Sequence, residues 1–225
     1  MEMNMEKKSR RPRPNLGEVA YDEIKAMILT GELKFGERLV LDELSERLNL
    51  SVTPIREALN KLAQDDLVVI TPRTSHSVVQ ISAQDAADIL DLRLLLETYA
   101  LQTAGNRLAT FPVSDFKHRF SEVTNSMDLK EFFIVDNAFH QAILSLSPNQ
   151  RLPKLYSYLQ NLIQVVSIQA IQSQNTDRIH EATEEHLELL GSIETGSVNA
   201  AVDCLQNHFE QMKSVVFRSA ACERA

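Results

Sequence analysis

The chain has little cysteine and no long hydrophobic run, and both absences narrow what the protein can be. Cys204 and Cys222 are the only two cysteines among 225 residues, so the disulfide framework of a small secreted protein is not expected. No stretch approaches the roughly 20 apolar residues that a membrane helix needs. Residues 1–14 lack the apolar core of a secretion signal. These features predict a reduced, cytoplasmic protein that does not act on a membrane.

The chain also lacks an excess of positive charge, which at first argues against a nucleic-acid partner. Its net charge is −8 at pH 7, but residues 1–80 carry 12 Lys and Arg against 13 Asp and Glu, so the acidity belongs to residues 81–225. Residues 1–14 form a basic arm that we expect to be disordered by itself. Such an arm either contacts phosphates without sequence preference or serves as a solubilising tail. Its cations are Lys7, Lys8, Arg10, Arg11 and Arg13.

Residues 48–70 have the pattern of a helix that reads DNA. Ser51 and Thr53 both suit an N-cap, and Pro54 is tolerated in a first helical turn, where its missing N–H would have no partner anyway. Arg56 lies in the first turn on the polar face, where a cation opposes the helix dipole. We therefore expect Arg56 to meet an anionic partner, such as a DNA backbone or a guanine edge. The apolar face has helical spacing and consists of Ile55, Leu59 and Leu62.

The segments on either side of this helix predict a winged helix-turn-helix. Residues 40–48 read as a short helix and Asn49-Leu50 as a tight turn, although a generic helical hairpin would have the same spacing. Downstream, β-branched runs at 68–71 and 77–81 flank residues 72–76, which is the pattern of a hairpin. A hairpin directly after a recognition helix is a wing. The predicted small core consists of Leu39, Leu44, Leu48, Ile55, Leu59 and Leu67.

Three segments in this half resemble the winged-helix domain of the GntR family of bacterial transcription regulators: residues 28–33, 35–39 and above all 51–59. The chain departs from the family at Val52, where the family usually has a base-reading Arg, and near Ser75, where the wing usually has Gly. A β-branched Val can at most touch a thymine methyl group, so the resemblance implies the docking mode but not the operator sequence. It implies that DNA is contacted by Arg38, Ser51, Val52, Thr53 and Arg56. The hairpin pattern places His76 at the wing tip, where we expect it to meet a phosphate or a minor-groove edge.

The chain therefore divides into a predicted winged helix-turn-helix domain at 15–80 and an all-α domain at 81–225, which together make a mainly α fold. In the first domain, residues 17–30 read as a helix whose inward residues are Val19, Ile24, Met27 and Ile28. Ser82 with Asp85 resembles a capping box at the start of the second domain. No strand pattern follows, and about six helices are expected near 83–107, 113–125, 128–146, 150–173, 177–195 and 197–220. Such a bundle can enclose a cavity.

The second half resembles the FCD effector-binding domain of the FadR-type branch of the same family, in its smaller, VanR-like version with about six helices. The matching stretches are 91–97, 136–140, 147–149 and 185–187. Organic acids are the usual effectors of that family. The resemblance places Arg93 in the cavity, where its guanidinium could hold a carboxylate in a bidentate manner. The alternative for Arg93 is an ion pair with Glu97 on the helix surface.

Asp136 and His140 are four residues apart and project from the same helix face, but this pair alone is a weak signal. The resemblance strengthens it, because Asp136, His140, His186 and His208 occupy the four ligand positions of metal-binding FCD domains. One carboxylate and three imidazoles suit a divalent metal, zinc first, with nickel, cobalt or manganese as alternatives. Otherwise His186 could be a solvated helix residue and His208 could cap a helix end. The remaining His118 and His180 are expected at the surface.

Together these patterns predict a homodimeric regulator, in the first place a repressor, that binds a palindromic operator. A small organic acid bound in the metal-centred cavity would alter the DNA-binding state. A metalloenzyme is the alternative from another class, but no nucleophile elbow or phosphate loop is present and no free carboxylate lies in an obvious general-base position. A third interpretation makes the metal purely structural in a constitutive DNA binder. We expect the protein not to be an enzyme.

Overall fold

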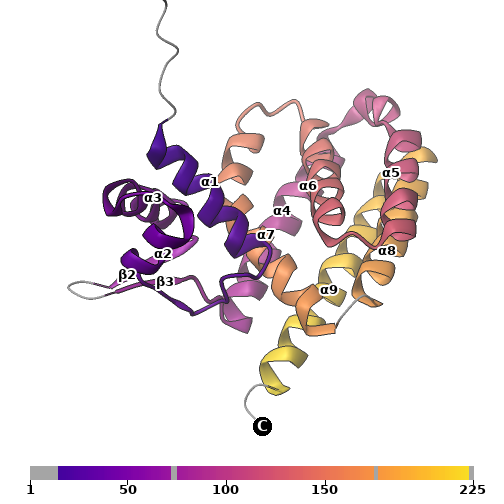
Figure 1. Cartoon of the computed structure of the whole chain (residues 1–225). Coiled ribbons are helices and arrows are strands. Elements are labelled where there is room, and N and C mark those ends of the chain that lie inside the picture. The colour runs from indigo at the N-terminus through magenta and orange to yellow at the C-terminus, as the bar shows by residue number, and fades with distance from the viewer. Residues whose placement is uncertain (1–14, 72–74, 175–176, 223–225) are drawn as a thin grey trace, which may run out of the picture. The chain divides into compact units, whose positions relative to one another are not determined.

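The computed structural model describes residues 15–71, 75–174 and 177–222 (Figure 1). The basic arm predicted at 1–14 lies outside these described residues. The chain separates into two compact units, residues 1–79 and 80–225, and each is described by itself. The described residues are mostly helical, with one small sheet, so the predicted mainly α fold is confirmed.

The first unit packs three helices against a three-stranded antiparallel sheet. Strand β3 lies in the middle of the order β1-β3-β2, and His76 of β3 is opposite both Leu39 and Ile70. The sequence did not predict β1, because two residues are too few to form an alternating pattern. The elements are α1 (Leu16–Leu29), β1 (Arg38–Leu39), α2 (Leu41–Leu48), α3 (Val52–Gln64), β2 (Val68–Thr71) and β3 (Ser75–Val78).

Local chemistry sets the ends of these helices. The Asn15 side chain accepts a hydrogen bond from the Gly17 backbone N–H and caps α1. Helix α2 ends at Asn49, whose φ of 52° is in the left-handed region that Asn tolerates better than most residues. Helix α3 begins after Ser51, and Pro54 lies in its first turn as predicted, although the Ser51 side chain makes no capping hydrogen bond.

The core of this unit lies between α1, α3 and the sheet. Ile55, Leu59 and Leu67 are fully buried as predicted. Two of the predicted inward residues are not buried: Val19 is 40% exposed, and Leu48 is only half-buried. The prediction for Val19 was wrong because Ala20 and Tyr21, one and two positions further along α1, face the core instead.

The second unit consists of six α-helices and one 3-10 helix over its described residues. The first predicted helix, 83–107, is divided: α4 ends at Thr103, and Gly105 has a φ of 54° at the start of η1. Ser82 caps α4 by accepting from the Asp85 backbone N–H and donating its hydroxyl to the Asp85 carboxylate. The elements are α4 (Ala83–Thr103), η1 (Gly105–Thr110), α5 (Val113–Ser126), α6 (Leu129–Ser145), α7 (Leu152–Gln174), α8 (Asp177–Glu194) and α9 (Val198–Cys222).

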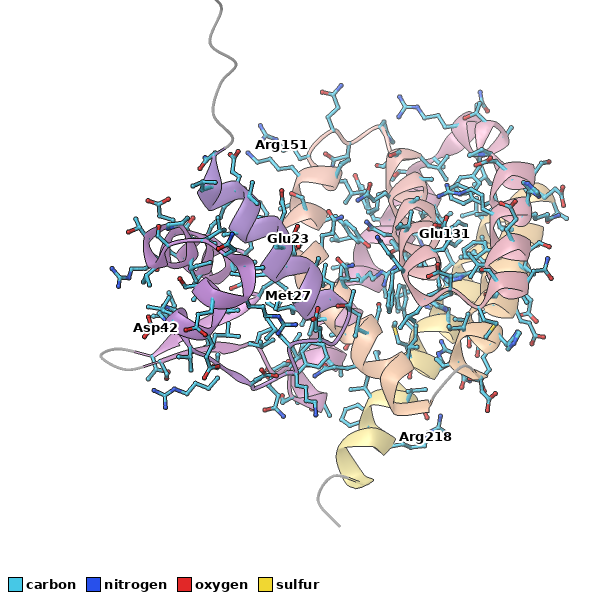
Figure 2. The ribbon with its side chains drawn as sticks, viewed as in Figure 1. Glu23, Met27, Asp42, Glu131, Arg151 and Arg218 are labelled. Atoms are coloured by element: carbon cyan, nitrogen blue, oxygen red, sulfur yellow. The ribbon has the colours of Figure 1, made fainter. Side chains whose placement is uncertain are left out.

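The helices of this unit enclose an interior that is both aromatic and polar. Phe116 and Phe120 of α5 pack edge-on against Phe139 of α6, and the Phe120 ring stacks on the His186 ring at 4.8 Å between centroids. Exposed charges such as Glu131 of α6 lie on the outside of the helices (Figure 2). None of the helices in the described parts of the chain is long and apolar enough to span a bilayer.

Candidate metal centre and DNA-reading surface

Four side chains from three helices converge inside the second unit. Asp136 and His140 lie one turn apart on α6, His186 lies on α8 and His208 on α9. The Nε2 atoms of His140 and His186 are 3.2 Å apart, and the Oδ1 of Asp136 is 3.6 Å from the first and 3.4 Å from the second. One ring nitrogen from each of the three histidines lies within 4.8 Å of the others. The structure therefore brings together all four residues that the sequence singled out as ligands.

Two carboxylates form hydrogen bonds with the Nδ1 atoms of two of the three imidazoles. The Nδ1 of His140 donates to Glu97 of α4, and the Nδ1 of His208 donates to Glu185 of α8, both at 2.6 Å. Since an ionised carboxylate can only accept, these contacts place a proton on the Nδ1 of each ring and turn its Nε2 towards the centre. A carboxylate behind a histidine is the usual outer support of a metal ligand.

Two buried arginines complete the network. The Nε of Arg93 donates to Glu97 at 3.0 Å, and its Nη2 lies 3.7 Å from Asp136. Arg178 forms a bidentate pair with Glu185 at 2.7 and 2.9 Å. The ion pair between Arg93 and Glu97 exists, but both side chains are 0% exposed. The alternative that placed this pair on the helix surface is therefore wrong. Neither Glu97 nor Glu185 is free to act as a general base.

Burial and neighbouring charges set the protonation of the four residues. Burial lowers the pKa of His186 well below its usual range and the charge of His208 adds to this effect, so His186 is neutral. Burial also lowers the pKa of His208. Burial would raise the pKa of Asp136, but His140 and Arg93 outweigh it and lower that pKa strongly. For His140, burial and Arg93 lower the pKa, and the carboxylates of Glu97 and Asp136 raise it by more.

These residues fit a divalent cation by an observation independent of the resemblance. The Nε2 of His208 is buried and has no hydrogen-bond partner among the described residues. The Nε2 atoms of His140 and His186 are 3.2 Å apart, so one proton can be shared between them when no cation is bound. A cation gives all three lone pairs and the Asp136 oxygen a common partner. His186 Nδ1 also has no hydrogen-bond partner in the described part of the chain, so a carboxylate supports two of the three histidines and not the third.

The sequence did not assign roles to Glu97, Glu185 or Arg178. Glu97 was weighed only as a surface partner of Arg93, and Glu185 belonged to a matching stretch without a stated function. A usable signal was present: Glu97 follows Arg93 by four residues, so any cavity reached by the arginine is also reached by the glutamate. Arg178 and Glu185 also share one face of α8, because they are seven residues, about two helical turns, apart.

The remaining histidines have other environments. His118 has a side chain that is 71% exposed, and His180 is also exposed, as expected for surface residues. His76 does not lie at a wing tip: it is half-buried inside β3. The reason is that β3 begins at Ser75, two residues before the predicted strand, and ends at Val78 rather than Ile81.

The residues assigned to DNA contact are accessible in the first unit. Arg56, Ser51 and Thr53 are exposed around the first turn of α3, and Val52 is half-buried. Arg38 is exposed on β1. A surface hollow of about 480 Å³ brings Arg38 and His76 together, with Leu39, Val40, Leu41, Asp42, Ile70, Thr71 and Ser75 as its other lining residues.

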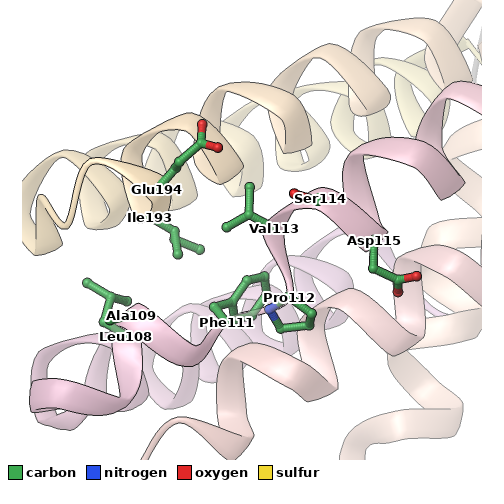
Figure 3. A pocket seen from close by; sticks show the side chains of 9 residues that line it. All are labelled: Leu108, Ala109, Phe111, Pro112, Val113, Ser114, Asp115, Ile193 and Glu194. Carbon is green, nitrogen blue, oxygen red and sulfur yellow. The ribbon is translucent and has the colours of Figure 1, made fainter.

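Another hollow, of about 460 Å³, lies on the second unit between η1, the start of α5 and the end of α8 (Figure 3). Its charged lining residues are the carboxylates Asp115 and Glu194, and Pro112 and Ile193 form part of its apolar wall. It contains none of the predicted site residues and offers no cation to hold an acid.

Comparison with known families identifies both units. Residues 16–78 match the model of bacterial regulatory proteins of the gntR family, and residues 88–211, more than half of the chain, match the FCD domain. The chain belongs to the GntR family and carries an FCD domain. It is accordingly a DNA-binding transcription regulator and not an enzyme.

Two relatives match this chain along most of its length. The HTH-type transcriptional regulator YdhC of Bacillus subtilis strain 168 is 25% identical over 204 residues, which cover 87% of this chain and 90% of that protein. The gluconate operon transcriptional repressor of the same bacterium is 22% identical over 208 residues, covering 88% and 83%.

Solved structures agree on the fold. E. coli McbR/YncC has a TM-score of 0.70 at 21% identity, covering 92% of this chain and 99% of that one. A metal-free FCD domain, that of TM0439, has a TM-score of 0.55 at 17% identity and covers 64% of this chain and 99% of that one. At these identities the likeness establishes the architecture alone.

Proposed function

We propose that this regulator is a cytoplasmic, homodimeric repressor whose affinity for a palindromic operator is changed by a small carboxylate bound at a metal ion. The observation that carries the proposal is the convergence of one carboxylate and three imidazoles in the interior of the second unit, at Asp136, His140, His186 and His208. The repressor relatives support the direction of control. The domain limits we propose are 15–80 for reading DNA and 81–225 for sensing.

The first unit would read DNA with the exposed start of α3. Arg56 and Thr53 are exposed there, and no ion pair or hydrogen bond within the described residues engages the Arg56 side chain. A cation at a helix start is unfavourable in the free protein because of the helix dipole. A DNA phosphate or a guanine edge at that position would interact favourably with it. Arg38 and His76 line one hollow, which suits a second anchor on the backbone. With Val52 replacing the family arginine, we expect the operator to differ from the usual one.

A divalent ion would be held by Asp136, His140, His186 and His208. Zinc is our first choice because imidazole ligation suits it, and nickel, cobalt and manganese accept the same donors. When bound, the ion supplies a Lewis-acidic position that attracts a carboxylate. The chain's own contribution is orientation: Glu97 and Glu185 fix two of the rings.

Arg93 would hold the effector carboxylate beside this ion. Its Nη1 and Nη2 atoms are buried and have no hydrogen-bond partner within the described residues, and its Nη2 lies 3.7 Å from Asp136. A planar guanidinium can bind a carboxylate in a bidentate manner, here in place of its contacts with Asp136 and Tyr156. To act as an effector, the acid must bind the DNA-competent and DNA-incompetent forms with different affinity.

An exposed apolar stripe on α4 supports the homodimer. Leu92, Leu95 and Tyr99 recur at helical spacing and are 47%, 64% and 42% exposed. The neighbouring helix α7 adds Leu155 and Tyr158, which are 53% and 66% exposed. Exposed apolar side chains of this kind commonly mark an interface, and a second copy would cover them symmetrically.

The test is the affinity of the full chain for DNA from its own promoter region, measured by fluorescence anisotropy at fixed salt. We expect tight binding of the metal-loaded protein and weaker binding when a panel of carboxylic acids includes the effector. Chelation should remove the response to acid and leave the far-ultraviolet circular dichroism unchanged. If chelation unfolds the protein, the metal is structural; if no promoter DNA binds, the regulatory proposal is wrong.

A further inference from the structure

The DNA-reading domain is acidic when the basic arm is left out of the count. Residues 15–80 contain 7 Lys and Arg against 11 Asp and Glu, a net charge of −4. Two of these cations already have a partner inside the unit: Arg47 forms an ion pair with Glu32, and Lys61 lies over the Tyr21 ring, 4.2 Å from its centroid. Cations that replace counterions along the phosphates supply a large share of the affinity for DNA. The domain therefore needs a further source of positive charge.

The basic arm is the one segment of the sequence that offers such a source. Residues 7–14 contain five cations and no acidic residue. Residues 81–225 carry 11 Lys and Arg against 18 Asp and Glu, so the helical domain adds no excess of positive charge. The electrostatic attraction to DNA must come largely from the arm.

The arm joins the first unit beside the DNA-reading end of α3. Helix α1 packs along α3 (Figure 1), and a Cβ atom on Gly17 would lie only 2.9 Å from the Glu57 Oε2. Four residues further along both helices, Lys61 covers the Tyr21 ring. Since the second contact follows the first by the same step in each helix, α1 and α3 run in the same direction. The start of α1 is therefore level with the early turns of α3, where Arg56 is exposed.

Two hydrogen bonds fix this entry point. The Asn15 side chain accepts from the Gly17 backbone N–H and sets the start of α1. The Tyr21 hydroxyl donates to Asp65, the residue that ends α3, at 2.5 Å. The chain before Asn15 consequently departs from the reading end of α3. Eight residues extend at most roughly 28 Å, or roughly eight base-pair steps of DNA, so the cations at 7–14 can reach phosphates outside the bases that α3 contacts.

We propose that residues 7–13 are part of the DNA-binding surface: their cations bind the phosphates that flank the base pairs read by α3 and supply most of the electrostatic attraction to DNA. The inference rests on DNA binding through α3 and is independent of the metal and the effector. It decides between the two roles that the sequence leaves open for the arm, because a tail that only aids solubility would leave DNA affinity unchanged.

The test is the salt dependence of DNA binding by the full chain, measured by fluorescence anisotropy with a labelled duplex from its own promoter region. The arm variant combines Arg10→Gln, Arg11→Gln and Arg13→Gln. Each phosphate contact contributes about 0.9 to the slope of log K against log salt concentration, so we expect the slope to become shallower by about 2 to 3 per chain. At low salt the affinity should fall about ten-fold or more.

The matched control removes the same charge from the second unit. It combines Arg107→Gln, Lys130→Gln and Arg218→Gln, which replace three exposed cations. If the arm variant and this control have the same slope and affinity, the arm contributes only to overall charge and the inference is wrong. Tighter DNA binding by the arm variant would mean that the arm engages an acidic surface of the protein instead, which also overturns the inference.

Hydroxyl-radical footprinting on the same promoter DNA locates the contact. The original chain should protect the backbone on both sides of the central site, and the arm variant should lose this flanking protection while it keeps the central one. Identical footprints would contradict the inference and leave the reading role of α3 intact. If the original chain protects no DNA at all, DNA reading by α3 and the role of the arm both fail.

Discussion

At the scale of single residues, the carboxylates behind the histidines decide how well the centre holds an ion. Glu185 accepts from His208 and is itself fixed by Arg178. Glu185→Gln should lower metal affinity by about 10- to 100-fold, as outer-shell changes commonly do, while the ligands stay in place. Competition with a chromophoric chelator measures this affinity. Glu181→Gln is the matched control, because Glu181 also contacts Arg178 but is 56% exposed; an equal loss there would contradict the assigned role.

The corresponding test of DNA binding is a substitution of Arg56. Arg56→Ala should cost about 1–3 kcal/mol of DNA binding, close to a 5- to 150-fold loss, if the side chain reads a base edge. Operator titration by anisotropy measures it. The first unit should keep its fold, because the side chain is exposed. Arg151→Ala removes the same charge from an exposed position in the second unit (Figure 2), and a similar loss of affinity there would show a general charge effect.

The sequence was sufficient to choose the four ligands but not to place their supports. Asp136 and His140 are linked by spacing, and the resemblance supplied His186 and His208. Glu97 and Glu185 come from helices whose angular positions depend on packing, which no local pattern records. His76 was misplaced for a related reason: the start of a strand is set by pairing with Leu39 and Ile70 across the sheet, not by β-branched residues alone.

At the scale of elements, α6 matters most because it carries both Asp136 and His140. Its start is capped by Asp128, whose carboxylate accepts from the backbone N–H groups of Lys130 and Glu131. Asp128→Ala should therefore cost about 1 kcal/mol of stability and lower the melting temperature by a few degrees. Asp128→Ser retains a capping oxygen and should restore most of the loss. Equal melting temperatures for the alanine variant and the original chain would show that the cap is not used.

Most helices of the second unit could be placed from the Pro, Gly and Asn residues that separate them in the sequence, and the exceptions have physical causes. The break after Thr103 was missed because Gly105 lies within an otherwise helical pattern and only its positive φ reveals the turn. The leucines of α4 did not indicate which face of the helix is buried, since Leu92 and Leu95 are exposed while Leu90 is buried. A helix with apolar residues on two faces has little amphipathic contrast to read.

At the scale of the whole molecule, the exposed stripe on α4 predicts association of two copies. Leu95→Glu places a charge at the most exposed residue of that stripe and should shift the protein from dimer to monomer, because a buried unpaired carboxylate is costly. Light scattering coupled to size exclusion measures the mass in solution. Ile134→Glu is the control, since Ile134 is also an exposed apolar residue, at 49%, but lies on α6. A chain that is monomeric before the change, or dimeric after it, would remove the stripe as the interface.

The proposed regulation depends on one divalent metal ion held jointly by Asp136, His140, His186 and His208. The most direct measurement is the metal content of the purified full chain by inductively coupled plasma mass spectrometry, after dialysis against a weak chelator. We expect one equivalent of metal per chain, less than a tenth of that in His186→Ala and in His208→Ala, and a full equivalent in His118→Ala. A chain without metal after exposure to zinc, nickel, cobalt and manganese, or variants that keep a full equivalent, would contradict it.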